Sequence, residues 1–281
     1  MTTNTKITFI GAGNMASSII AGLIESKAAV DVTVSDPNEA QLDIIRGQFP
    51  NCATATDNQQ AVSEADVVVL AVKPQIMQLV CEALQESIQQ IKPLIVSVAA
   101  GVSESSLNRW LGGLLPVVRC MPNTPALVQA GMSGLYANAK VSDEQKSLAE
   151  SMLRAVGMVQ WFDDEEMLHA VTAVSGSGPA YFFLVMEAMQ KSAESFGFTP
   201  EQASLLVQQT AFGAAKLAME SADSAAVLRE KVTSKGGTTE AAINHLQASG
   251  LEGIFDEALK AAASRSIVLS GDKPAIEKTE G

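Results

Sequence analysis

Hydrophobic positions up to about Trp161 fall into short β-branched runs that alternate with longer periodic segments. The short runs are rich in Val and Ile and bounded by breakers, which is typical of strands. They predict strands at 6–10, 31–35, 65–72, 93–100 and 115–121. Between them, segments such as Met15–Lys27 and Gln75–Gln89 have apolar residues at three- and four-residue spacing and predict helices. Apolar strands that alternate with helices in this way indicate a parallel sheet covered on both faces.

After Trp161 the pattern is helical, with hardly a strand signal. We therefore expect an α/β fold in two parts, a doubly wound sheet domain at 1–162 and an all-helical domain at 163–281. The segments Ala180–Phe196 and Glu201–Glu220 are apolar around much of their circumference, and such helices must be covered on more than one side. This predicts pairing with a second subunit, and packing on the first domain is the alternative.

Composition narrows the classes of partner. The chain has 281 residues, 47% of them hydrophobic, and a formal net charge of −12. The acidic balance without a basic run argues against nucleic acid as a partner, so an anion site must be built locally from amides and hydroxyls. Cys52, Cys81 and Cys120 fit neither a disulfide framework nor a zinc pattern, and we expect no metal. The pattern suggests neither a secretion signal nor a membrane span, so the expected location is the cytoplasm.

The stretch FIGAGNMASSIIAGL places Gly11, Gly13 and Ala16 in a Gly-x-Gly-x-x-Ala spacing between a predicted strand and a predicted helix. The first glycine allows a tight turn, the second lets the backbone approach a pyrophosphate, and the third small residue lets helix and strand pack closely. Amides at the helix start then face the diphosphate. This context predicts a Rossmann-type domain that binds a dinucleotide.

The end of the second predicted strand leaves the choice of dinucleotide open. Asp36 can accept from a ribose 2′-hydroxyl, which favours NAD, whereas Ser35 and Asn38 can donate to a 2′-phosphate, which favours NADP. Further along, Lys73-Pro74 and Asn123 follow later strands at the edge where ligands bind in such sheets.

Two later motifs resemble helix starts. In VSGSGPAYFF, Ser177 and Gly178 precede Pro179, which is typical of a helix N-terminus; ordinary capping and substrate contact both remain open. In VTSKGGTTEAAI we expect Thr238 to be the N-cap and the two glycines to permit positive φ. The surplus of hydroxyls there favours an anionic ligand such as a carboxylate.

Other catalytic patterns are weak. His169 and His245 lie in helical segments without a partner at metal spacing, and we interpret both as structural. Glu187 and Glu220 are interpreted first as solvated acids on helices.

The motifs together closely resemble the pyrroline-5-carboxylate reductases. FIGAGNM, AVKPQ, SVAAGV, RCMPNTPALVQAG, AVSGSGPAYFF and VTSKGGTTEAAI occur in that family's order and spacing, over about Ile7 to Ile267. The resemblance implies reduction of the cyclic imine L-1-pyrroline-5-carboxylate to L-proline, the last step of proline biosynthesis, by direct hydride transfer from NADPH, with NADH usable by some members. It also implies a helical domain that interlocks with its partner in a homodimer, with further assembly into decamers in some members.

By this resemblance the glycine loop holds the diphosphate and ribose, Ser35 and Asn58 meet the 2′-phosphate, and later residues line the path to the nicotinamide. The implied cofactor residues are Gly11, Gly13, Asn14, Met15, Ser35, Asn58, Val72, Lys73, Pro74, Ala100 and Asn123. Ser234, Gly237 and Thr238 resemble the residues that hold the substrate carboxylate. The hydroxyl of Thr239 resembles the catalytic one that meets the ring nitrogen, and Glu220 aligns loosely with an acid near that ring.

The chain departs from the family pattern in two places. Asp36 beside Ser35 keeps the cofactor preference open, and Lys235 stands where many members have proline. Two other functions fit parts of the pattern. A hydroxyacid dehydrogenase shares the layout, but Lys191 or Lys216 would have to be its catalytic residue. The other alternative is a non-catalytic NADPH sensor, which would not need the residues that hold a substrate carboxylate.

Overall fold

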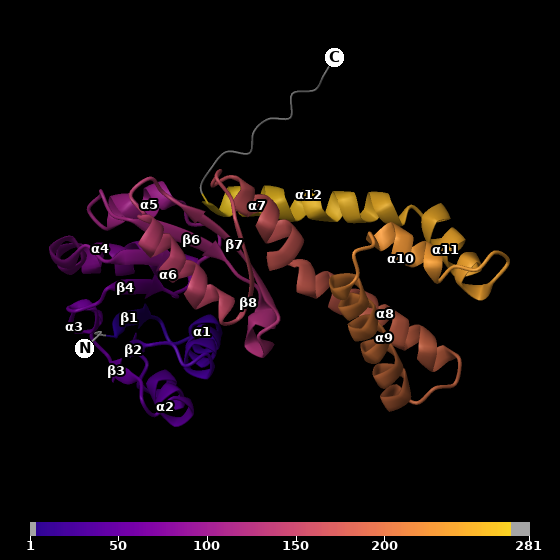
Figure 1. Ribbon diagram of the computed structural model, residues 1–281, viewed down its shortest axis with the longest axis horizontal. Coiled ribbons are helices and arrows are strands. Elements are labelled where there is room, and N and C mark those ends of the chain that lie inside the picture. The colour runs from indigo at the N-terminus through magenta and orange to yellow at the C-terminus, as the bar shows by residue number, and fades with distance from the viewer. Residues whose placement is uncertain (1–3, 271–281) are drawn as a thin grey trace, which may run out of the picture. The chain divides into compact units, whose positions relative to one another are not determined.

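The computed structural model describes residues 4–270 (Figure 1). The chain divides into two compact units. The first extends to Ser177 and takes in the chain again from Ala262, and the second is Gly178–Ala261. The first unit thus continues past residue 162 because the helical turns that follow pack on its sheet. The domain boundary at 162 and 163 stays a prediction.

The first unit contains one eight-stranded sheet with the order β3-β2-β1-β4-β5-β6-β7-β8. The strands are β1 (Thr5–Ile10), β2 (Val30–Ser35), β3 (Ala53–Ala55), β4 (Val67–Leu70), β5 (Leu94–Ser97), β6 (Val117–Met121), β7 (Gly131–Ala137) and β8 (Gly157–Trp161). The five predicted strands are confirmed as β1, β2, β4, β5 and β6. The hydrophobic pattern does not reveal the other three, which lack long runs of Val and Ile.

Six strands that are neighbours in the sheet run parallel: β3, β2, β1, β4, β5 and β6. The parallel arrangement of the five predicted strands among them is confirmed. The other edge is formed by two strands that were not predicted, and there β7 runs antiparallel to β6 and β8 runs parallel to β7. The connection from β6 to β7 explains this. It holds only a short 3-10 helix, η1 (Thr124–Val128), whereas a parallel crossover needs about a dozen residues or more.

Helices cover both faces of this sheet (Figure 1). The helical segments of the first unit are α1 (Asn14–Glu25), α2 (Glu39–Gln48), α3 (Asn58–Val62), α4 (Pro74–Ile91), α5 (Glu104–Trp110), α6 (Asp143–Arg154), α7 (Met167–Val171) and the π-helical turn η2 (Thr172–Gly176). One face buries Ile7 and Phe9 against α1, α2 and α6, and the other buries Ile10 and Leu70 against α4 and α5. The predicted α/β class with a doubly wound sheet is confirmed.

The second unit is helical, as predicted. Its helices are α8 (Gly178–Ser195), α9 (Pro200–Glu220), α10 (Ala225–Lys231), α11 (Thr238–Ala248) and α12 (Leu251–Ser270), the last of which ends in the first unit. Large apolar side chains on α8 and α9 are exposed, among them Phe182, Phe183 and Phe212. The buried residues of α9 are only Ala203 and Val207. The apolar surface of these helices therefore exceeds what their own unit covers.

The segment around Ser177 joins the π-helical turn η2 to the predicted helix start at Gly178. The N–H of Ser177 donates to the carbonyl of Thr172 at 2.8 Å, which continues the wide π-type winding of η2. Helix α8 begins at Gly178 with Pro179 at its second position, as predicted. It follows η2 almost without interruption, so Ser177 lies between two helical segments of one nearly continuous run. By length and composition alone this run, Met167–Ser195, is apolar enough to cross a membrane, which the sequence analysis did not anticipate. The same composition suits a helix covered by neighbouring helices.

Candidate functional site

The expected cofactor residues follow the carboxyl ends of neighbouring parallel strands. Gly11 follows β1, Val72 and Lys73 follow β4, Ala100 follows β5, and Asn123 follows β6. Because the carboxyl ends of parallel strands meet at one edge of a sheet, these residues share the edge at which open α/β sheets bind ligands.

The backbone of the glycine loop is fitted closely to the sheet. Gly11 has a φ of 103°, which favours glycine, and its N–H donates to the carbonyl of Ser35 at 2.7 Å. A Cβ added to Gly11 would lie 2.8 Å from the carbonyl oxygen of Ala71. The first glycine therefore allows the chain to turn from β1 towards α1 past the end of β4 without a clash.

Gly13 has a different role from Gly11. It is the N-cap of α1 with a φ of −79°, and no side chain caps the helix start. A Cβ added to Gly13 would meet no atom within 4 Å. The residue is exposed, as is Asn14 after it, while Met15 is half-buried. The open space beside uncapped amides fits a diphosphate, because those amides and the helix dipole attract negative charge.

The end of β2 gathers the residues expected to discriminate between dinucleotides. The buried hydroxyl of Ser35 donates to the side-chain oxygen of Asn58 at 2.7 Å. The carboxylate of Asp36 accepts from the main-chain N–H groups of Ala12 and Asn38, each at 2.9 Å. Ser35 and Asn58 thus lie together, and Asp36 ties the glycine loop to the end of β2.

The start of α4 is as predicted, with Pro74 at its first position after the N-cap Lys73. Lys73 is exposed and Val72 half-buried. Pro74 and Ala100 line the same cavity, of about 600 Å³, together with Arg109 and Trp110 from α5. Two of the expected cofactor residues are therefore brought to one hollow in the first unit.

The side chain of Asn123 forms two hydrogen bonds with the main chain of the protein. Its Oδ1 accepts from the N–H of Met132 at 2.8 Å, and its Nδ2 donates to the carbonyl of Ser175 at 3.0 Å. Pro179 has no N–H for the carbonyl four residues before it, which is that of Ser175. Asn123 thus replaces a missing helix hydrogen bond, and one of its amide hydrogens remains for a cofactor.

The late motif belongs to the second unit and begins α11. The N-cap is Gly237, so the prediction of Thr238 as N-cap is wrong; Thr238 occupies the first helical position. Of the two glycines only Gly236 has positive φ, at 73°. No side chain caps the helix, because Gly237 has none. Three N–H groups at this start, those of residues 238–240, meet no acceptor among residues 4–270.

Ser234 is exposed before this helix start, and Thr239 is half-buried in its first turn. Glu220 ends α9, and Lys216 lies one turn before it, with Nζ 3.8 Å from its Oε1. Glu240 is not among the residues expected from the sequence, yet its carboxylate accepts from the N–H of Gly236 at 2.7 Å. An acid at the third position of a helix is the signal that could have indicated it.

Three helix starts without a side-chain cap lie at expected ligand contacts. Six helices of residues 4–270 are capped by an Asn, Asp, Ser or Thr side chain: α2, α3, α5, α6, α9 and α10. α1, α4, α7 and α11 lack such a cap. α7 follows Glu166, which is not an expected contact, whereas the other three have the N-caps Gly13, Lys73 and Gly237. Their N-terminal amides are therefore free to bind other groups.

The two histidines contribute differently. His169 is buried, and its Nδ1 lies 2.9 Å from the hydroxyl of Ser266 on α12, which supports the structural interpretation. His245 is exposed on α11. Among residues 4–270 no group of three or more His, Cys, Asp and Glu side chains could hold a metal ion.

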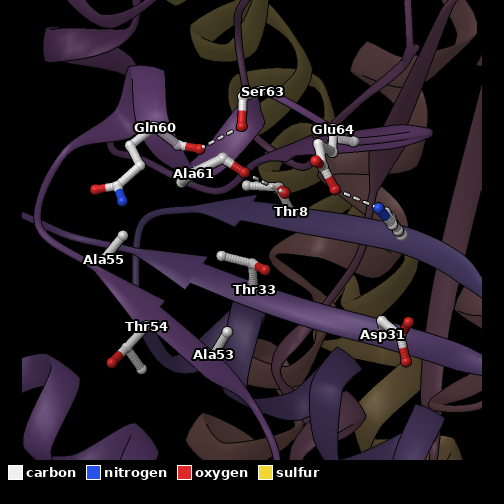
Figure 2. Close-up of a pocket in the computed structure, with 12 residues that line it drawn as sticks. Thr8, Asp31, Thr33, Ala53, Thr54, Ala55, Gln60, Ala61, Ser63 and Glu64 are labelled. Atoms are coloured by element: carbon white, nitrogen blue, oxygen red, sulfur yellow. Dashed lines mark hydrogen bonds and ion pairs between the residues drawn. The ribbon is translucent and has the colours of Figure 1, made fainter.

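A separate polar pocket of about 320 Å³ opens over β1, β2 and β3 beside α3. Figure 2 shows the Thr8 hydroxyl directed at the carbonyl of Ala61, to which it donates at 2.9 Å. Thr33 and Asp31 line the pocket from β2, and the ion pair of Lys6 with Glu64 lies at one end. Its lining includes none of the expected site residues.

Comparison with known proteins identifies the family. Residues 165–269 match the family of pyrroline-5-carboxylate reductase dimerisation domains, and residues 6–101 match the family described as NADP oxidoreductase, coenzyme F420-dependent. The pyrroline-5-carboxylate reductase of Pseudomonas aeruginosa is 52% identical over 266 residues, which cover 94% of this chain and 97% of that protein. The chain belongs to the pyrroline-5-carboxylate reductase family.

Further relatives agree with this assignment. The pyrroline-5-carboxylate reductase of Pasteurella multocida is 46% identical over 265 residues, covering 93% of this chain and 96% of its own. A solved pyrroline-5-carboxylate reductase from Coxiella burnetii superposes with a TM-score of 0.89 at 46% identity, covering 96% of this chain and 99% of that one. As a pyrroline-5-carboxylate reductase, the chain is an oxidoreductase with an NADP-binding sheet domain and a helical domain for homo-oligomerisation. The predicted family, fold class and enzyme class are confirmed.

Proposed function

We propose that this chain reduces L-1-pyrroline-5-carboxylate to L-proline with NADPH, and that its late motif holds the substrate. The start of α11 is the observation that carries the proposal. It offers three N–H groups without an acceptor in residues 4–270, an uncapped helix end, and the hydroxyls of Ser234, Thr238 and Thr239 nearby in sequence. A carboxylate suits such a helix start, because amides and helix dipole both attract an anion.

The residues divide the work. Ser234, Gly237 and Thr238 bind the substrate carboxylate. The Thr239 hydroxyl is the catalytic group, and it forms a hydrogen bond with the ring nitrogen. Glu220 adds an acid near the ring. Reduction adds a hydride to the imine carbon and a proton to the nitrogen. Bound NADPH would supply the hydride and become NADP⁺, and solvent, directly or through a chain of hydroxyls, would supply the proton. The protein contributes mainly orientation, which can account for several kcal/mol of the barrier.

The cofactor residues hold NADPH from the sheet domain. Gly11, Gly13, Asn14 and Met15 bind the diphosphate and ribose. Ser35 and Asn58 form the 2′-phosphate site, in which the Ser35 hydroxyl donates to Asn58 and the Asn58 amide donates to the phosphate. The hydrogen bond between Ser35 and Asn58 supports this, since it orients the amide of Asn58. Val72, Lys73, Pro74, Ala100 and Asn123 line the path to the nicotinamide. NADH is accepted more weakly, because it lacks the phosphate.

The assembly belongs to the same proposal. The family's dimerisation domain and the exposed apolar faces of α8 and α9 support a homodimer. We further propose that dimers assemble into decamers and that the enzyme works in the cytoplasm. Sedimentation of the purified protein across a concentration series measures the assembly size.

One assay tests the reaction. Purified protein is mixed with NADPH and then with L-1-pyrroline-5-carboxylate, a 2-hydroxyacid or a 2-keto acid, and NADPH absorbance is followed. Loss of NADPH with the cyclic imine alone, and formation of L-proline, is the expected result. Turnover with the keto acid would favour a hydroxyacid dehydrogenase. Binding of NADPH without turnover of any of these substrates would favour a sensor.

A further inference from the structure

The residues before α11 form a tight turn. The N–H of Gly237 donates to the carbonyl of Ser234 at 3.0 Å, three residues earlier. Gly236, the third residue of the turn, has a φ of 73°. This hydrogen bond together with positive φ at the third residue defines a type II turn, in which Lys235 occupies the second position.

Two adjacent glycines make this turn intrinsically loose, because glycine loses more conformational freedom on ordering than other residues do. Proline is common at the second position of a type II turn, because its ring restricts φ to the value that the turn needs. In this chain the residue at that position is Lys235. The sequence of the turn therefore does not hold it rigid. A contact from outside the turn must do so.

Glu240 makes that contact. Its carboxylate accepts from the N–H of Gly236 at 2.7 Å, from the third position of α11 back to the residue before the N-cap. In the usual capping box an acid at this position binds the N-cap amide. Here the N-cap amide of Gly237 already serves the turn, so Glu240 binds one residue further out.

We propose that Glu240 is a positioning residue that fixes the Ser234–Gly237 turn in the shape that receives the substrate carboxylate. The inference rests on the proposed function of the late motif. Glu240 occupies only the amide of Gly236, which leaves the N–H groups of Thr238 and Thr239 without an acceptor in residues 4–270. The negative charge of Glu240 lies near the residues that bind the substrate carboxylate and repels that carboxylate. Glu240 therefore favours substrate binding through its hydrogen bond and not through its charge.

The geometry of the turn gives a steady-state test. Glu240→Ala is expected to raise KM for pyrroline-5-carboxylate about tenfold, because a strong hydrogen bond no longer orders the turn. Glu240→Gln keeps an acceptor and removes the charge, so its KM should equal that of the wild type or fall below it. KM for NADPH should not change in either variant. Glu252→Ala, which removes an acid from the first turn of α12, is the matched control.

Rescue makes the test specific. Adding Lys235→Pro to Glu240→Ala supplies the missing rigidity within the turn and is expected to recover most of the lost KM. This comparison is made in high salt, so that loss of the Lys235 charge does not alter long-range attraction of the substrate. An unchanged or lower KM in Glu240→Ala would show that Glu240 competes with the substrate, and absence of rescue would also overturn the proposal.

Hydrogen exchange at single residues tests the turn without any activity. The N–H of Gly237 should exchange about tenfold faster in Glu240→Ala than in the wild type, and at the wild-type rate in Glu240→Gln. Equal exchange in all three would overturn the positioning role. If the wild type orders the turn in this way but does not reduce pyrroline-5-carboxylate, the proposed function fails while the role of Glu240 in the turn stands.

Discussion

The side-chain amide of Asn123 donates to the carbonyl oxygen of Ser175 across 3.0 Å. It joins the end of β6 to the π-helical turn η2, where Pro179 leaves that carbonyl without its usual donor. Gly176, next along η2, lies so close to Met121 that an added Cβ would be 2.4 Å from its methyl carbon. Asn123, the expected nicotinamide contact, thus also links the end of β6 to η2.

Asn123→Ala is expected to lower the free energy of unfolding by about 1–3 kcal/mol, because it leaves the partly buried N–H of Met132 and carbonyl of Ser175 without their partner. Urea unfolding followed by circular dichroism measures the loss. Asn51→Ala, at an exposed asparagine, is the control and should change little. Normal stability with strongly weakened NADPH binding would mean that Asn123 serves the cofactor alone.

Replacement of the two loop glycines should separate folding from binding. Gly11→Ala forces a Cβ against the carbonyl of Ala71 at positive φ, so it should reduce both stability and NADPH affinity. Gly13→Ala meets no protein atom and keeps an ordinary φ, so it should weaken NADPH binding at least tenfold and leave the melting temperature within about 2 °C. Calorimetry and NADPH fluorescence titration measure the two effects. Undiminished NADPH binding in Gly13→Ala would place the diphosphate elsewhere.

Asp36 supports the glycine loop through its bond from the Ala12 amide. Asp36→Ala should therefore weaken the binding of NADPH and of NADH by similar factors, about ten- to a hundredfold, as expected for the loss of one hydrogen bond to a charged group. Dissociation constants for both dinucleotides measure this. Asp31→Ala, at the start of the same strand, should leave both unchanged. A selective loss of NADH would instead indicate a contact of Asp36 with the ribose hydroxyl.

The buried thiols make stability depend on alkaline pH. Burial raises the pKa of Cys81 and of Cys120 to about 12, whereas an unfolded thiol titrates near pH 8.5. The stabilising contribution is complete below that unfolded pKa and is lost as the pH rises towards 12, because the unfolded chain then releases protons that the folded chain retains. Unfolding free energy should fall by roughly 1 kcal/mol per pH unit per thiol above about pH 9. The Cys81→Ala, Cys120→Ala double variant should show a flatter slope between pH 8.5 and 10, and an equal slope would contradict the prediction.

Thr239→Ala should lower the turnover number substantially and leave NADPH binding near normal, since the hydroxyl is assigned to the substrate nitrogen. A loss of about tenfold to a hundredfold is the size expected for one transition-state hydrogen bond. Steady-state kinetics and a separate NADPH titration provide the two numbers. Thr210→Ala, at an exposed threonine within α9, is the control. Equal loss of turnover and NADPH binding would rule out this division of roles.

The sequence predicts a strand correctly where the residues of that strand alone determine its structure. The Val-rich interior strands β4 and β5 are apolar on both faces, so their pattern alone identifies them. β3, β7 and β8 are short or rich in small and polar residues, and their pairing depends on neighbours that the pattern does not show.

The candidate site divides in the same way. The glycine spacing predicted the Gly11 turn, since positive φ is a local property. The N-cap of α11 fell on Gly237 and not on Thr238, because the turn that precedes it decides where the helix begins. The bonds of Asn123 to Met132 and Ser175, and of Glu240 to Gly236, depend on the folded geometry and have no sequence signature beyond residue type.

The exposed phenylalanines of α8 and α9 give this protein a stability that depends on its own concentration. The second unit buries few apolar side chains of its own, so covering Phe182, Phe183 and Phe212 must come from association. Mass action then links folding to subunit pairing, and the melting temperature rises with protein concentration. Dilution is therefore expected to lower the stability of this enzyme.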